Sequence, residues 1–136
     1  MKIAFVGTGM IGSGLAVNAA LKGQNVVLYD VVDTDIVKNT VNKVLDILVE
    51  AGAIDRSRAD EAFASMSFTQ DLSEAVTDAD FVQECVPEKI ELKHSTYRSI
   101  QEICGQDVII ASSTSGMFPS KLSEGALYPE KIIVGH

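Results

Sequence analysis

The segment Phe5–Gly14 reads FVGTGMIGSG and places four glycines within eight positions, directly behind the apolar run KIAFV at residues 2–6. Three of these glycines, Gly7, Gly9 and Gly12, have the spacing G-x-G-x-x-G. The residues that follow, GSGLAVNAALKG at 12–23, are rich in alanine and leucine. This order predicts a buried strand, a tight turn and a helix.

Short apolar runs alternate with longer segments of helical period along the rest of the chain. The predicted strands are 2–6, 25–30, 66–69, 80–86, 107–113 and 131–136, and the predicted helices are 12–23, 33–52, 56–64, 72–79 and 90–104. Strands that alternate with helices and consist largely of Val and Ile favour a parallel sheet covered on both faces. We therefore predict an α/β fold, a doubly wound and mostly parallel Rossmann-type sheet, in a single domain over residues 1–136.

The composition narrows the range of functions. The chain has 136 residues and a net charge of −8, which argues against binding to nucleic acid or to an anionic membrane surface. No apolar stretch approaches the roughly 20 residues of a membrane span, so we expect a soluble, cytoplasmic protein. The two cysteines, Cys85 and Cys104, lack the number and spacing of a disulfide framework or a zinc site, and we predict two free thiols and no metal site.

Each motif glycine has a separate expected role. Gly7 allows the sharp turn, Gly9 lets the backbone approach a pyrophosphate, and Gly12 lets the helix pack closely on the sheet. The phosphates of a dinucleotide would then contact free amides at a helix N-terminus. We assign these cofactor contacts to Gly7, Gly9, Met10, Ile11 and Gly12. A glycine-rich turn that serves packing alone is the alternative.

An acidic residue, Asp30, ends the second predicted strand, eighteen positions after Gly12. Such a carboxylate accepts hydrogen bonds from the adenine ribose hydroxyls and repels a 2′-phosphate. The expected cofactor is therefore NAD rather than NADP.

Three stretches in the second half of the chain are FVQECVPEKIELKHSTYRSI at 81–100, VIIASSTSGMFPSKL at 108–122 and VGH at 134–136. They resemble the NAD-binding domain of the 3-hydroxyacyl-CoA dehydrogenase family, whose E-x-V-P-E-x-x-x-x-K, S-N-T-S and G-x-H-F-x-N-P runs come in the same order. The resemblance extends from Lys2 to His136.

Two departures favour one branch of this family. Ser113 stands where the CoA enzymes have Asn, and the end of the second helix carries the acidic residues Asp46, Glu50 and Asp55 instead of a lysine-rich surface. Both features resemble the branch that acts on small 3-hydroxy acids, such as L-gulonate 3-dehydrogenase (lambda-crystallin) and L-carnitine dehydrogenase. Oxidation of a 3-hydroxyacyl-CoA is the alternative, and a non-catalytic NAD-sensing module is an alternative of another class.

The resemblance also implies the roles of individual residues. His136 matches the catalytic histidine, a general base for the substrate alcohol, and Ser115 matches the serine that contacts substrate and cofactor. Glu88 and Lys93 match positions that contact the cofactor near its nicotinamide ribose. Two structural alternatives stay open: the residues 112–114 can serve as helix caps, and Lys93 can belong to a solvated helix face.

In the family a later glutamate orients the histidine, and a helical second domain encloses the substrate and forms most of a homodimer interface. We therefore expect the 136 residues alone to bind NADH but to turn over almost nothing.

Overall fold

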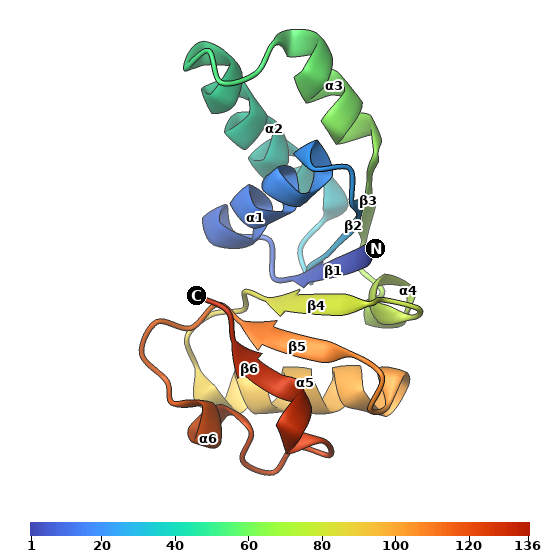
Figure 1. Ribbon diagram of the computed structural model, residues 1–136, viewed down its shortest axis with the longest axis vertical. Coiled ribbons are helices and arrows are strands. Elements are labelled where there is room, and N and C mark those ends of the chain that lie inside the picture. The colour runs from blue at the N-terminus through green and yellow to red at the C-terminus, as the bar shows by residue number, and fades with distance from the viewer.

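The computed structural model describes residues 1–136 as one α/β sandwich (Figure 1). Its strands are β1 (Lys2–Val6), β2 (Asn25–Tyr29), β3 (Met66–Thr69), β4 (Phe81–Glu84), β5 (Ile109–Ser112) and β6 (Ile132–Val134). Its helices are α1 (Met10–Leu21), α2 (Thr34–Glu50), α3 (Arg56–Ala64), α4 (Leu72–Val76), α5 (Ile90–Cys104) and α6 (Pro119–Leu122), with a 3₁₀ turn, η1, at Pro129–Lys131. The predicted elements are all present.

The six strands form one parallel sheet in the order β3-β2-β1-β4-β5-β6. The chain moves outward from β1 to β2 and β3, then crosses back to β4 on the other side of β1. The connection that leaves β1 and the connection that leaves β4 run in opposite directions along the sheet. A crevice therefore opens at the carboxyl ends of β1 and β4, where ligands of such sheets bind. The predicted doubly wound parallel sheet is confirmed.

Two apolar layers cover the two faces of the sheet. The first joins β1, β2 and β3 to α1, α2 and α3 through residues such as Phe5, Leu28 and Leu45, and the second joins the sheet to α4, α5 and α6 through residues such as Val82, Ile110 and Ile100. Figure 1 shows α1–α3 on one side of the sheet and α5 and α6 on the other. β1 and β2 contact both α1 and α4, and β3 contacts both α2 and α4.

Local signals explain most element boundaries. Three aspartates, Asp33, Asp55 and Asp71, accept hydrogen bonds from backbone N–H groups at the starts of α2, α3 and α4. Gly52 adopts a φ of +72° just after α2, as its predicted position beyond the helix end requires. No helix combines the length and apolar character needed to cross a membrane.

The structure differs from prediction in several boundaries. The strands predicted at 80–86 and 107–113 are shorter and comprise Phe81–Glu84 and Ile109–Ser112. The short helix α6 was not predicted; it begins at Pro119, a residue suited to the first turn of a helix.

Candidate functional site

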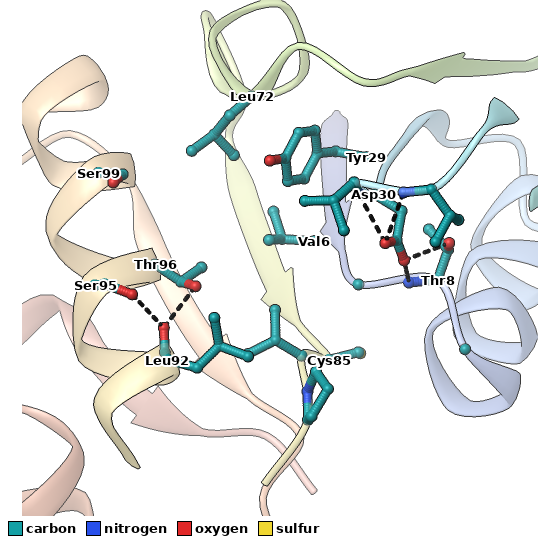
Figure 2. A pocket seen from close by; sticks show the side chains of 16 residues that line it. Val6, Thr8, Tyr29, Asp30, Leu72, Cys85, Leu92, Ser95, Thr96 and Ser99 are labelled. Atoms are coloured by element: carbon teal, nitrogen blue, oxygen red, sulfur yellow. Dashed lines mark hydrogen bonds between the residues drawn. The ribbon is translucent and has the colours of Figure 1, made fainter. Parts of the chain in front are cut away.

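A cavity of about 640 Å³ opens at the carboxyl edge of the sheet, between the ends of β1 and β2 and helix α5. Figure 2 shows Tyr29 and Asp30 on one wall and Leu92, Ser95 and Thr96 on the facing helix. The lining residues are Val6, Gly7, Thr8, Gly9, Tyr29, Asp30, Val31, Val32, Leu72, Cys85, Val86, Pro87, Leu92, Ser95, Thr96 and Ser99. The volume lies within the range typical of small-molecule and cofactor sites.

The glycine turn forms the floor of this cavity. Gly7 has a φ of +94°, and a Cβ there would lie 2.6 Å from the carbonyl carbon and oxygen of Cys85. A Cβ on Gly12 would overlap the Gly7 carbonyl oxygen and lie 3.2 Å from the Cβ of Cys85. Gly7 and Gly12 therefore have the steric roles that their spacing predicts. Gly9 differs, because a Cβ there would meet no atom within 4 Å.

Helix α1 begins directly above the cavity. Its N-cap residue, Gly9, offers no side chain to the N–H groups of the first turn, so these donors remain open to a ligand. The side chains of Met10 and Ile11 are 64% exposed and do not line the cavity. Any contact that these two residues make with a cofactor would thus come from their backbone.

Asp30 stands at the cavity wall and is held there by Thr8. Its Oδ2 accepts from the Thr8 N–H at 2.7 Å and from the Thr8 hydroxyl at 2.8 Å, and its Oδ1 accepts from the N–H of Val31 at 2.8 Å. Ribose hydroxyls would have to share the carboxylate with these donors. The Thr8 hydroxyl is the donor that can rotate away, since its hydrogen is not fixed by the backbone.

A buried charged cluster lies behind the cavity, at the end of β4. Glu84 and Lys93 are 0% and 1% exposed, and the Lys93 Nζ lies 2.8 Å from Glu84 Oε1. The other oxygen of Glu84 accepts from the hydroxyls of Tyr97, at 2.5 Å, and Ser112, at 2.7 Å. Burial raises the pKa of Tyr97 far above its usual range, and the hydrogen bond to Glu84 adds to the rise. The cluster thus joins β4, β5 and α5 through one fully bonded carboxylate.

Lys93 does not belong to a solvated helix face, so that alternative is wrong. Its ammonium points into the protein because Glu84 and the Val86 carbonyl, at 3.4 Å, receive it there. The same Nζ lies 3.8 Å from Oε2 of Glu88, a side chain that is 50% exposed. Glu88 also accepts from the Thr114 hydroxyl. Lys93 and Glu88 are therefore brought together, with Glu88 as the member that faces solvent.

Ser115 and His136 follow the ends of two neighbouring strands, β5 and β6, and both are exposed. The Gly135 N–H donates to the Ser112 carbonyl at 2.9 Å and so ties the two strand ends together. Residues 112–114 do not cap a helix: α6 begins at Pro119 without a side-chain cap. They bond to Glu84, Gln83 and Glu88 instead.

Both cysteines are free and half-buried. Burial raises the pKa of the Cys85 thiol and the Glu84 carboxylate adds to this, whereas a contact with Ser113, at 3.0 Å, and the Lys93 charge act in the opposite direction. Burial also raises the pKa of Cys104, whose thiol donates to the Val76 carbonyl at 3.3 Å, away from the main cavity. Each thiol is therefore mostly protonated at neutral pH.

We expect iodoacetamide at pH 8 to alkylate both thiols more slowly in the folded chain than in urea, because the raised pKa leaves little thiolate. Saturating NADH should slow the alkylation of Cys85 further and leave Cys104 unchanged, since only Cys85 lines the cavity. Peptide mass spectrometry over a time course measures both rates. Equal protection of the two cysteines, or of neither, would place the dinucleotide elsewhere.

Sequence reasoning missed several residues of the site. Thr8, Gln83 and Glu84 were not predicted. A signal for the last two was present, because a polar residue inside an apolar strand run, as in FVQE, indicates a buried hydrogen-bond partner. The polar face of α5 formed by Ser95, Thr96 and Ser99 was also missed, because hydroxyl residues at these helical spacings are common on solvated helices.

Three comparisons place the chain among known proteins. A sequence model described as 3-hydroxyacyl-CoA dehydrogenase, NAD binding domain, matches residues 2–136. The chain is 42% identical over 138 aligned residues to an L-carnitine dehydrogenase/betainyl-CoA thioesterase of Ruegeria pomeroyi, covering 98% of this chain and 27% of that protein. It is 35% identical to the human lambda-crystallin homolog, covering 98% of this chain and 43% of the relative.

Among solved structures, a diketoreductase superposes with a TM-score of 0.91 and 31% identity, covering 100% of this chain and 49% of the other. The chain thus spans about a quarter to a half of the length of the proteins that it matches. With the glycine turn, the parallel sheet and a family match over nearly every residue, the chain belongs to the NAD-binding domain family of the 3-hydroxyacyl-CoA dehydrogenases.

Proposed function

We propose that residues 1–136 form the NAD-binding domain of a dehydrogenase that transfers hydride between NAD and a small L-3-hydroxy acid. One observation carries the proposal: the cavity bounded by Gly7, Gly9 and Asp30 opens at the same edge of the sheet at which Ser115 and His136 follow their strands. A cofactor bound along this edge would lie within reach of both side chains.

The residues present fit a dinucleotide. Gly9 leaves open space where any other residue would place a Cβ, and the neighbouring N–H groups of α1 have no side-chain cap. Backbone donors at a helix N-terminus suit a pyrophosphate. Asp30 at the wall suits the hydroxyls of an unphosphorylated ribose and opposes a 2′-phosphate, which supports NAD over NADP.

When bound, NAD supplies the acceptor for a hydride. The imidazole of His136 takes the proton of the substrate hydroxyl, a general-base role that histidine fills in many enzymes. The Ser115 hydroxyl accepts from the alcohol and donates to the ketone, so it serves both directions. Glu88, whose side chain is half exposed, offers its carboxylate to the nicotinamide ribose, and the Lys93 ammonium lies 3.8 Å from this carboxylate on the protein side.

Relatives named L-carnitine dehydrogenase and lambda-crystallin homolog support a substrate without coenzyme A. The acidic residues Asp46, Glu50 and Asp55 near the end of α2 also support it, because they would repel a polyphosphate. A cytoplasmic location and a homodimer stay predictions from the family resemblance. Rates with L-carnitine, L-gulonate and acetoacetyl-CoA would rank the substrates, and a preference for the thioester would favour the CoA alternative.

In the protein at its full natural length, we expect His136→Ala to lower kcat for 3-hydroxy acid oxidation by about 10³-fold, because the general base is lost. The Kd for NADH should stay within about twofold. Stopped-flow absorbance and fluorescence titration measure the two quantities. His94→Ala is the matched control, since the hydrogen bond of the His94 ring goes to the Lys121 carbonyl and His94 does not line the cavity. NADH binding without oxidation of any hydroxy acid would favour the NAD-sensing module.

A further inference from the structure

Gln83 presents a buried amide to the ends of two strands. It lies on β4, is 8% exposed, and points to the face of the sheet opposite Glu84. Its Nε2 donates to the Ser113 hydroxyl oxygen at 2.7 Å and to the Gly135 carbonyl at 3.4 Å. One side chain therefore bonds to both segments that carry Ser115 and His136.

The end of β6 has few other attachments. The Gly135 N–H donates to the Ser112 carbonyl, but no side chain other than Gln83 forms a hydrogen bond with residues 132–136. A Cβ on Gly135 would lie 3.0 Å from the Cβ of Ala111 and 3.7 Å from Oε1 of Gln83, so the peptide packs closely against both.

Ser113, the other acceptor of the Gln83 amide, is itself held by several contacts. Because the Ser113 oxygen accepts from Gln83, its own hydrogen is free to face the Cys85 sulfur at 3.0 Å, on the cavity lining. The Ser113 N–H donates to the Glu84 carbonyl at 2.8 Å. Ser113 is thus fixed on three sides, two positions before Ser115.

An apolar residue would occupy position 83 at lower energetic cost, because burying an amide costs free energy unless the amide forms hydrogen bonds. We infer that Gln83 is a positioning residue. Its amide donates to both the Ser113 hydroxyl and the Gly135 carbonyl, and so fixes the peptide that carries His136 relative to the loop that carries Ser115. The inference rests on the proposed function for His136 and Ser115.

The test uses Gln83→Met, which keeps the length of the side chain and removes both donors. In the full-length protein kcat should fall about ten- to a hundredfold, because displacement of a catalytic group by about 1 Å has effects of this size. The Kd for NADH should change less than twofold. Ser113→Ala removes only one of the two acceptors of Gln83 and should lower kcat by no more than Gln83→Met does. The double variant should be no worse than Gln83→Met alone, because both substitutions act on one hydrogen-bond network. Gln24→Met, in the exposed turn after α1, is the matched control.

A second readout does not depend on activity. Amide hydrogen exchange at Gly135, followed by NMR, should accelerate at least about tenfold in Gln83→Met and not in Gln24→Met, because local opening of the strand end becomes easier. Unchanged exchange would overturn the inference. So would a kcat within twofold of the unmodified protein, or an equal loss of kcat and NADH affinity, which marks a merely structural role. Activity that survives His136→Ala would instead overturn the proposed function.

Discussion

Gly12→Ala is expected to destabilise the fold severely. The new Cβ would overlap the Gly7 carbonyl oxygen and press on the Cβ of Cys85. The first obstacle belongs to the glycine turn and the second to the residue that directly follows β4, so relief requires α1 to move away from the sheet. We expect a loss of at least about 3 kcal/mol in the free energy of unfolding, the upper range for overpacking, and a fall of about 10 °C in Tm.

Gly7→Ala should behave similarly, because a φ of +94° and contacts at 2.6 Å with the Cys85 backbone both oppose a Cβ. Thermal unfolding followed by circular dichroism measures the loss.

Two other glycines of the same stretch provide the controls. Gly9→Ala meets no atom within 4 Å and should leave Tm nearly unchanged, but its methyl group would enter the cavity and weaken NADH binding by about tenfold or more, equal to ~1.4 kcal/mol. Gly14→Ala, inside α1 and also free of contacts, should stabilise the helix by about 0.5–1 kcal/mol without affecting NADH. If Gly12→Ala is as stable as Gly14→Ala, the described packing of α1 is wrong.

The second large effect is expected for Lys93→Met. The substitution keeps the volume of the side chain but leaves the Glu84 carboxylate, 0% exposed, without its ammonium partner. Breaking a buried pair from one side costs about 3–5 kcal/mol, because an uncompensated charge stays inside. Urea unfolding at pH 7 measures this loss as a lower midpoint with an unchanged slope.

The double variant Lys93→Met/Glu84→Gln should recover part of this stability, since the remaining groups are neutral and Tyr97 and Ser112 can still donate. Lys38→Met is the matched control on the surface: Lys38 pairs with Asp35 at 3.1 Å, with side chains 40% and 81% exposed. An exposed pair contributes at most about 1 kcal/mol. Comparable losses for Lys93→Met and Lys38→Met would contradict the buried cluster.

The periodicity of the sequence was sufficient for the fold. Apolar runs such as KIAFV and NVVLY correspond to β1 and β2 with few changes, because parallel strands buried on both faces need continuous apolar residues. The glycine spacing also predicted which positions lie against backbone. The family resemblance, rather than periodicity, pointed to Ser115 and His136, and their roles stay predictions.

The polar interior of the site could not be predicted in the same way. The direction of Lys93 depends on Glu84 reaching the same buried point from another element, and residue spacing on one helix carries no information on that. The same holds for Gln83, whose partners Ser113 and Gly135 lie 30 and 52 positions away in the chain. Contacts of this kind depend on strand register, which alone brings these residues together.

The lining of the cavity contains no lysine and no arginine. A dinucleotide taken up there would be held by main-chain dipoles over short distances, an attraction that dissolved ions screen far less than they screen exposed charges. Affinity in such a cavity responds weakly to ionic strength, whereas a lysine-lined pocket loosens as salt rises. A polypeptide of net charge −8 can thus take up a polyanion without long-range attraction. The association rate constant of the two is correspondingly low, because no electrostatic steering brings them together.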